Sequence, residues 1–274
     1  MKIDLIFITH NRLKYTKLAL EGLLADPTEE FSLTIWDNAS SNGMRDYLSS
    51  VEDSRISRKV FSRENLGLRG PINDLFSNSS ADLVGIIPDD YLVTPGWTRP
   101  IAEAHADVPL FGAIFCWHLG RDCFDLTRAQ HKIQKFDRHS ILRHPWSGGG
   151  AGLVKLRAVK ECGLLKSSNT VGYWRLMAQK GYLNGFYYPL IHVENMDYPW
   201  SEHYAFSDRL QEGLKMSVTS GGRGIRTLEE SKAWHQVVLG NILDDPWDVK
   251  YYFGWRRKLR RGMQRIRRIS NLHR

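Results

Sequence analysis

The chain has 274 residues, with 38 lysines and arginines against 30 aspartates and glutamates, and 11% of its residues are aromatic. A chain of this length can bury a large core, and this aromatic content excludes a disordered protein. Three cysteines without a C-x-x-C spacing exclude a disulfide scaffold and a thiolate zinc site. We therefore expect a folded protein in a reducing, cytoplasmic compartment.

The charge and the apolar segments are unevenly distributed. The N-terminal apolar run covers only residues 5–8, too few for the core of a signal peptide. No stretch approaches the roughly 20 apolar residues of a membrane-spanning helix. Residues 250–274 contain ten lysines and arginines and no acid, so the residues before them hold 28 basic and 30 acidic side chains. We expect a soluble protein, or one attached to the inner face of the cell membrane only at its surface.

Apolar strands alternate with helical patterns over the first ninety residues. The predicted elements are, in order, a strand at 3–9, a helix at 13–24, a strand at 31–36, a helix at 44–51, a strand at 59–61, a helix at 71–76 and a strand at 81–87. Such alternation predicts an α/β fold with a mostly parallel sheet flanked by helices.

The pattern is less regular after Trp97. Further predicted elements are strands at 110–117, 153–156 and 186–193 and a helix at 174–180. Residues 118–145 are polar and weakly periodic, and we expect them to form a loop-rich excursion over the site. The expected domains are a body at 1–240, with halves at 1–97 and 98–240, and a basic extension at 241–274.

Polar side chains follow four predicted strands at their carboxyl ends. They are Thr9-His10-Asn11-Arg12, Asp37-Asn38, Arg63-Glu64-Asn65 and Asp89-Asp90. Ligands of parallel α/β sheets bind at this edge. Arginine can pair with phosphate, and a carboxylate can bind a divalent cation that neutralises a diphosphate. Asp37-Asn38 alone could form a turn, and Asp89-Asp90 alone could cap a helix or form a turn. Together, however, the four segments predict a nucleotide pocket.

These segments resemble the motifs of the GT-A glycosyltransferases, and within them the inverting family 2. Residues 3–12 are similar to the first strand and its T-x-N-R exit, and residues 35–43 resemble the V-D-N-x-S-x-D-G turn. Residues 63–73 resemble the E-N-x-G-x-x-x-x-x-N segment. Residues 87–97 resemble the D-x-D element, although Pro88 replaces its first aspartate. The resemblance covers about residues 1–200, and it implies a metal-dependent transferase that moves a sugar from a nucleotide-diphosphate donor, which we expect to be UDP-linked, to a hydroxyl of a glycan or lipid-linked glycan.

The resemblance also implies roles for the matching residues. The expected nucleotide-binding residues are Thr9, Asn11, Arg12, Asp37, which would hold the base, Asn65, Gly67, Arg69 and Asp89, which would face the ribose. The expected ligands of Mn²⁺ or Mg²⁺ are Asp90 and His192, and His192 could equally be hydrogen-bonded within its strand end. The residues expected near the donor sugar and acceptor are Trp146, Gly148 and Gly149. By the same resemblance, the half at 1–97 would bind the nucleotide and the half at 98–240 the acceptor.

The general base departs from the family pattern. Inverting transfer needs a carboxylate that deprotonates the acceptor hydroxyl, and the family places an E-D pair before a helix where this chain has residues 167–170, Ser-Ser-Asn-Thr. We expect Asp197 or Glu194 to act instead, because both follow the strand that carries His192. Glu202, Asp122 and Asp125 are alternatives. A retaining mechanism also stays open, as does an inactive nucleotide-binding protein that acts as a membrane- or RNA-binding module.

Residues 250–274 predict a basic amphipathic helix. Its apolar residues recur at three- and four-residue steps and are Tyr252, Trp255, Leu259, Met263, Ile266 and Ile269. This composition is typical of a helix that lies on an anionic membrane surface. A helix packed on the body is one alternative, and a nucleic-acid arm is another that we do not expect.

Overall fold

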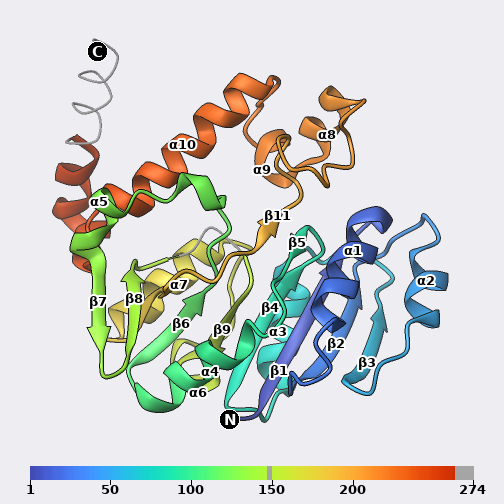
Figure 1. Cartoon of the computed structure of the whole chain (residues 1–274), viewed down its shortest axis with the longest axis horizontal. Coiled ribbons are helices and arrows are strands. Elements are labelled where there is room, and N and C mark those ends of the chain that lie inside the picture. The colour runs from blue at the N-terminus through green and yellow to red at the C-terminus, as the bar shows by residue number, and fades with distance from the viewer. Residues whose placement is uncertain (147–149, 263–274) are drawn as a thin grey trace.

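The computed structural model describes residues 1–146 and 150–262 (Figure 1). The strands are β1 (Ile3–Thr9), β2 (Ser32–Asp37), β3 (Ile56–Phe61), β4 (Leu83–Pro88), β5 (Tyr91–Leu92), β6 (Phe111–Phe115), β7 (Ile133–Phe136), β8 (His139–Arg143), β9 (Gly152–Lys155), β10 (Leu183–Tyr188) and β11 (Glu194–Asn195). The α-helices are α1 (Leu13–Leu24), α2 (Met44–Ser50), α3 (Arg69–Asn78), α4 (Thr98–Asp107), α5 (Leu126–Ala129), α6 (Leu156–Cys162), α7 (Thr170–Gln179), α8 (Leu210–Met216), α9 (Val218–Gly221) and α10 (Leu228–Asp244). Short 3₁₀ helices are η1 (Arg121–Cys123), η2 (Gln130–Lys132) and η3 (Val249–Tyr252).

Most strands form one large sheet in the order β3-β2-β1-β4-β9-β6-β10-β8-β7. Strands β3, β2, β1 and β4 are mutually parallel, and β6 is parallel to β10. Strand β9 runs antiparallel between β4 and β6, and β8 runs antiparallel to both β10 and β7. Only β8 and β9 therefore oppose the common direction, which confirms the predicted α/β fold with a mostly parallel sheet.

Helices cover both faces of the sheet. Alternate residues of β1 point to opposite faces: Leu5 and Phe7 pack in one core with α1, α2 and α4, and Ile6 and Ile8 pack in the other with α3, α6 and α7. Helices α8, α9 and α10 lie above the edge where β1 and β4 end (Figure 1). The carboxyl edge of the parallel strands therefore faces these helices.

The prediction of a loop-rich excursion at residues 118–145 is wrong, because this segment contains the β7–β8 hairpin at the edge of the sheet. The hairpin reverses at Asp137, whose φ is 51°. Its apolar periodicity is weak because polar side chains are buried beside it. Lys132 and His144 are both fully buried, and Lys132 Nζ lies 3.0 Å from His144 Nδ1.

Two further elements differ from the sequence-based expectation. The strand expected at 186–193 runs instead from Leu183 to Tyr188 and ends before Pro189, which has no N–H for a ladder hydrogen bond. Helix α10 was not expected, although Thr227 and Glu230 form a capping box at its start. This helix runs across residue 240, and the expected domain division there stays a prediction.

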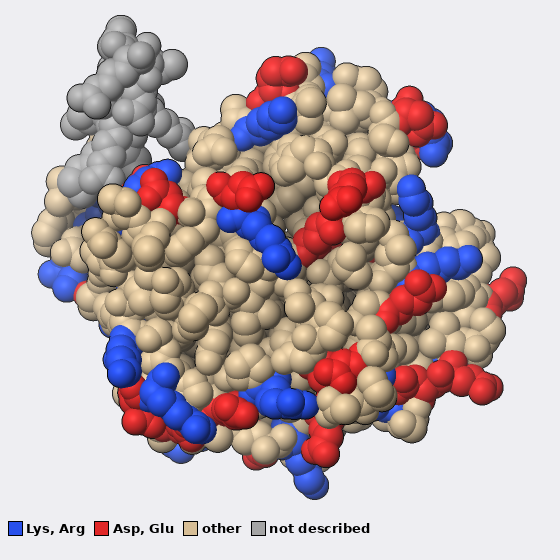
Figure 2. Space-filling model, in the orientation of Figure 1, with Lys and Arg blue, Asp and Glu red and all other residues tan. Residues whose placement is uncertain are grey.

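Within the described ranges, no helix is both long and apolar enough to cross a bilayer. On the face seen in Figure 2, basic and acidic side chains are interspersed. This mixture agrees with the nearly balanced charge of the residues before 250.

Candidate active site

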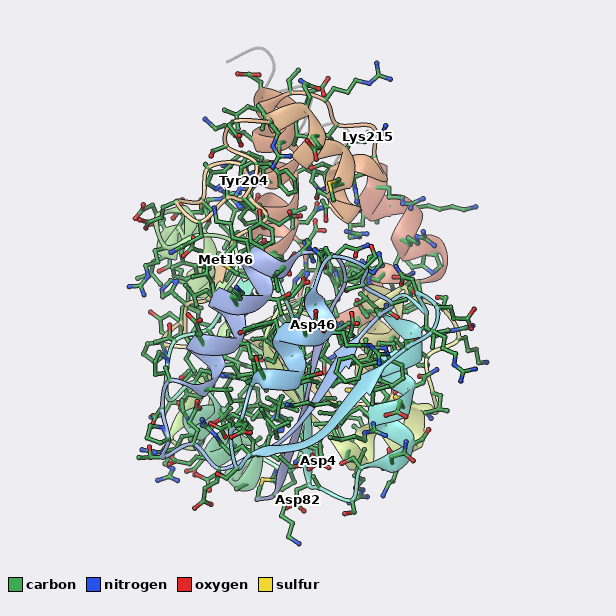
Figure 3. The ribbon with its side chains drawn as sticks, turned by 90° about the vertical axis from the view of Figure 1, so that its right-hand side faces the viewer. Asp4, Asp46, Asp82, Met196, Tyr204 and Lys215 are labelled. Carbon is green, nitrogen blue, oxygen red and sulfur yellow. The ribbon has the colours of Figure 1, made fainter. Side chains whose placement is uncertain are left out.

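The site lies at the carboxyl edge of β1, β2 and β4. Thr9 at the end of β1 pairs with Asp37 at the end of β2, and Ile8 pairs with Pro88 at the end of β4. Figure 3 shows Met196 and Tyr204 at this end of the molecule, and Asp4 and Asp82 at the opposite end. The expected nucleotide-binding segments therefore leave neighbouring strands side by side.

A two-residue strand brings a distant aspartate to this edge. Strand β11 pairs antiparallel with β5, with Asn195 opposite Tyr91, and the Met196 N–H donates to the Asp90 carbonyl at 2.8 Å. Asp197, the next residue, consequently lies beside Asp90. We call Asp89, Asp90 and Asp197 the carboxylate cluster.

The Arg12 guanidinium lies among the three members of the carboxylate cluster. Its Nη2 is 2.5 Å from Asp89 Oδ1, and its Nη1 is 3.2 Å from Asp90 Oδ2 and 3.7 Å from Asp197 Oδ1. Burial alone would lower the pKa of Arg12, but the three carboxylates outweigh it and raise that pKa. Arg12 therefore stays protonated, and the fully ionised cluster with Arg12 has three negative charges and one positive charge, a net charge of −2.

The three carboxylates differ in their surroundings. Asp89 is 1% exposed, and its Oδ2 accepts hydrogen bonds from the Thr9 hydroxyl at 2.9 Å and the His10 N–H at 3.3 Å. Burial raises the pKa of Asp89, and Arg12 opposes this rise. Burial and the neighbouring Asp90 raise the pKa of Asp197 to about 7. Desolvation and mutual repulsion thus disfavour the ionised cluster unless more positive charge binds.

One oxygen of the carboxylate cluster is available to a cation. Asp90 Oδ1 is buried and has no hydrogen-bond partner, and Mn²⁺ and Mg²⁺ prefer carboxylate oxygens as ligands. Asp90 therefore offers one oxygen ligand of the kind such a cation prefers. Across residues 1–146 and 150–262, however, no group of three or more histidine, cysteine, aspartate or glutamate side chains is arranged to hold a metal ion.

His192, the second expected metal ligand, lies at a different strand end. It forms an isolated parallel β-bridge with Trp117, which lies just beyond the end of β6. The His192 carbonyl accepts a hydrogen bond from the Thr94 hydroxyl at 2.7 Å. Burial and then Arg121 lower the pKa of His192, and its buried Nδ1 has no hydrogen-bond partner. Its imidazole is therefore neutral and able to bind a metal, and its role as a ligand stays a prediction.

The turns after β1 and β2 hold each other in place. Asp37 is 3% exposed and its Oδ1 accepts from the Ser40 N–H at 3.1 Å, as a turn-forming aspartate does. Asn11 has a φ of 54°, donates its N–H to Ser40 Oγ at 2.9 Å and accepts from the Ser41 N–H at 2.9 Å. Asp37 and Asn11 therefore shape the turns at this edge of the sheet.

Asn38 fixes the loop that contains two expected nucleotide-binding residues. Its amide donates to Asn65 Oδ1 at 2.8 Å and to the Gly67 carbonyl at 3.1 Å, and its Oδ1 accepts from the Leu66 N–H at 2.8 Å. Gly67 adopts a φ of 59°, which favours glycine. Arg69 lies farther along, exposed at the start of α3, with Nη1 3.5 Å from the Lys166 carbonyl. No motif predicts this role of Asn38, although it stands directly after Asp37 at the end of β2.

The two candidate bases have different partners. Asp197 belongs to the carboxylate cluster and also accepts a hydrogen bond from Ser217. Glu194 accepts from the Ser201 hydroxyl at 2.5 Å, and both of its oxygens lie 3.0 Å from His203 Nδ1. The Glu194–His203 pair could not be predicted from the sequence, because no recognisable motif links these residues.

Trp146 is buried. Its ring packs against the His144 ring, with 4.9 Å between the two centroids, and the Arg175 guanidinium carbon lies 5.4 Å from the Trp146 ring centroid. Gly148 and Gly149, expected near the donor sugar, lie outside the described residues. Their roles stay predictions.

Fold and site together define a nucleotide-sugar transferase of the GT-A type. The model of the glycosyl transferase family 2 matches residues 4–154, more than half of the chain. The chain belongs to this family, and it is a glycosyltransferase. A search of curated proteins by sequence found no match.

Solved structures share the fold at low sequence identity. A mannosyltransferase from Pyrobaculum calidifontis in complex with GDP-Man and Mn²⁺ is 16% identical, with a TM-score of 0.58, over 88% of this chain and 71% of that one. S. aureus TarS 1-349 in complex with UDP-GlcNAc is 12% identical, with a TM-score of 0.56, over 93% of this chain and 74% of that one. These similarities confirm the fold.

Proposed function

We propose that this glycosyltransferase uses a divalent cation to transfer a sugar from a UDP-linked donor to a hydroxyl of a glycan or lipid-linked glycan, with inversion at the anomeric carbon. The carboxylate cluster with its unpartnered Asp90 Oδ1 is the observation that carries this proposal. The Mn²⁺ in the mannosyltransferase complex supports the cation, and the UDP-GlcNAc in the TarS complex supports the donor class.

Each part of the site has a task in this reaction. Asp90 would hold Mn²⁺ or Mg²⁺, with His192 as the further ligand proposed from the sequence, and the bound cation would neutralise the departing diphosphate. Asp37 would hold the base, and Asn11, Asn65, Gly67 and Arg69 would line the nucleotide pocket. Thr9, Arg12 and Asp89 would shape its floor and orient the ribose.

Asp197 is our preferred general base, with Glu194 as the alternative. Asp197 lies beside Asp90, and burial raises its pKa in the cation-free protein, which favours acceptance of a proton from the acceptor hydroxyl. The acceptor O–H proton passes to the carboxylate while the acceptor oxygen bonds to C1 of the donor sugar. The bond from C1 to the diphosphate oxygen breaks, and the nucleotide diphosphate leaves with that electron pair.

A donor-hydrolysis screen tests the proposal without knowledge of the acceptor. Nucleotide sugars are incubated with the protein and Mn²⁺, and we expect release of UDP from at least one UDP-sugar. Asp90→Asn should abolish the release, whereas Asp82→Asn at the opposite end of the sheet should preserve it. Failure to release a nucleotide from any donor, together with UDP and Mn²⁺ binding, would favour an inactive nucleotide-binding protein.

We also propose that residues 250–274 contact an anionic membrane surface. Residues 254–262 are helical, and Trp255 and Leu259, one turn apart, are 68% and 53% exposed. Tyr252 is 2% exposed, so its expected place among the membrane-facing residues is wrong. Its hydroxyl donates to the Pro246 carbonyl, and Arg260 pairs with Asp245, which fixes this segment to the body. Met263, Ile266 and Ile269 lie outside the described residues.

Vesicle sedimentation tests the membrane contact. The double variant Trp255→Ser/Leu259→Ser should bind vesicles of phosphatidylserine and phosphatidylcholine more weakly than the wild type, because the inserted apolar area is lost. Leu110→Ser, at a residue that is 58% exposed elsewhere, is the control. Equal sedimentation of all three proteins would refute this contact.

A further inference from the structure

A group of basic side chains lies between α7 and the residues that follow α10. The guanidinium carbon of Arg175 on α7 is 5.4 Å from the Trp146 ring centroid and 4.7 Å from the Tyr252 ring centroid. The Arg260 guanidinium carbon is 4.2 Å from the same Tyr252 centroid, and the His144 ring centroid is 6.2 Å from it. Strands β9, β6 and β10 separate β4 from β8, so these side chains lie apart from the carboxylate cluster.

Three N–H groups around the Tyr252 ring have no acceptor in the described part of the chain. Arg175 Nε, Arg260 Nε and His144 Nε2 are buried and lack a hydrogen-bond partner. Burial, followed by Lys132 and Arg175, lowers the pKa of His144 well below its ordinary value, so the ring is neutral. His144 Nδ1 lies 3.0 Å from Lys132 Nζ, which donates, and the ring hydrogen is therefore on Nε2.

The positive charge at this place exceeds the negative charge. Burial chiefly lowers the pKa of Arg175 to about 10, and the neighbouring Arg260 and Arg257 add to this effect. Asp245 pairs with Arg260, whereas Arg175 forms no ion pair with a described residue. Three guanidinium groups and one carboxylate give a net charge of +2, and a partly buried charge without a counter-ion is costly. We call four side chains the basic cluster: His144, Arg175, Arg257 and Arg260.

We propose that the basic cluster binds a phosphate monoester group, at a site separate from the active site. Such a group carries about 1.5 to 2 negative charges at pH 7 and three acceptor oxygens, which complement the net charge and the N–H groups without acceptors. Guanidinium groups bind phosphate through parallel hydrogen bonds, and Arg175 is only half-buried, so a ligand can reach it from solvent. The bound phosphate joins α7 to the residues after α10. The proposal requires neither the cation nor the nucleotide sugar of the proposed function.

Calorimetric titration of the full chain with inorganic phosphate at pH 7, without metal or nucleotide, tests the site. Arg175→Met should weaken phosphate binding at least tenfold, because a charged hydrogen-bond donor is lost. Arg257→Met should weaken it at least threefold, and this residue is exposed, so the fold does not depend on it. Lys258→Met, at the next exposed residue, is the matched control and should bind phosphate as the wild type does. Equal phosphate affinity in the wild type, Arg175→Met and Arg257→Met would overturn the proposal.

Two further probes distinguish a soluble ligand from a lipid headgroup. The soluble probe is glycerol 3-phosphate, measured by calorimetry, and the lipid probe is a vesicle of phosphatidylcholine with phosphatidic acid, measured by sedimentation. A soluble ligand is supported if Arg257→Met weakens only the binding of glycerol 3-phosphate, and a headgroup is supported if the variant also weakens sedimentation relative to Lys258→Met. A wild type that binds neither soluble phosphate, and whose sedimentation is unchanged in Arg175→Met and Arg257→Met, would refute the site.

Discussion

Lys132 tests how the β7–β8 hairpin and helix α10 are held together. Its side chain is fully buried, with Nζ 3.0 Å from His144 Nδ1 and hydrogen-bonded to the Ile242 carbonyl of α10. Burial lowers the pKa of Lys132 from 10.5 to about 7, and Asp245 and Asp244 only partly oppose this effect. A difference of this size between the folded and unfolded states corresponds to about 5 kcal/mol.

The sign of this linkage is fixed by proton binding. Between pH 7 and pH 10.5 the unfolded state binds more protons at Lys132 than the folded state does, so stability rises with pH. Below about pH 7 the lysine is charged in both states and the full cost is present. Between pH 7 and pH 9 the wild type should therefore gain about 2 kcal/mol from this residue.

Lys132→Met removes the titrating group and keeps the side-chain volume. We expect the variant to lose this 2 kcal/mol rise and to be at least as stable as the wild type at pH 7, because a buried charge is replaced by an apolar group. Urea unfolding followed by tryptophan fluorescence at the two pH values measures the difference. Lys135→Met, at an exposed residue of β7, is the control. A Lys132→Met variant that keeps the wild-type pH slope would refute the reasoning.

Three further predictions concern the site. Asn38→Ala removes three hydrogen bonds to the 65–67 loop, so it should destabilise the protein by about 2 kcal/mol and weaken UDP binding at least tenfold. Unchanged UDP affinity in calorimetry would show that this loop does not touch the nucleotide. Asp37→Ala should weaken UDP binding even without metal, and a loss of stability with unchanged UDP affinity would assign Asp37 to the turn alone. Asp197→Asn should lower the rate of sugar transfer more than a hundredfold with UDP affinity nearly intact, whereas Glu194→Gln should retain most of the activity. The reverse ranking of the two variants would make Glu194 the base.

Local patterns allowed the first half of the fold to be predicted. Each strand from β1 to β4 is a short apolar run followed by a helix, and the period of each pattern is set by neighbouring residues. The β7–β8 hairpin could not be predicted in this way, because buried polar residues such as Lys132 and His139 interrupt its apolar pattern. The capping box at Thr227 and Glu230 marks the start of α10, and this local pattern could have predicted the helix.

The site could be predicted in its location but not in its contacts. Polar residues at the ends of parallel strands indicated the carboxyl edge, because ligands bind there in such sheets. The approach of Asp197 to Asp90 depends on the pairing of β5 with β11, which are two residues long and about a hundred residues apart. Such short, distant pairs leave no periodic pattern. The position of Arg12 among three carboxylates depends in turn on that pairing.

Calorimetric titration of UDP with and without Mn²⁺, on the wild type and on Asp90→Ala, tests the central claim most directly. The account predicts that Mn²⁺ strengthens UDP binding to the wild type at least tenfold, because the cation at Asp90 neutralises the diphosphate. In Asp90→Ala this strengthening should disappear, while the metal-free affinity stays within about twofold of the wild type. Equal strengthening by Mn²⁺ in both proteins would contradict a metal site at Asp90.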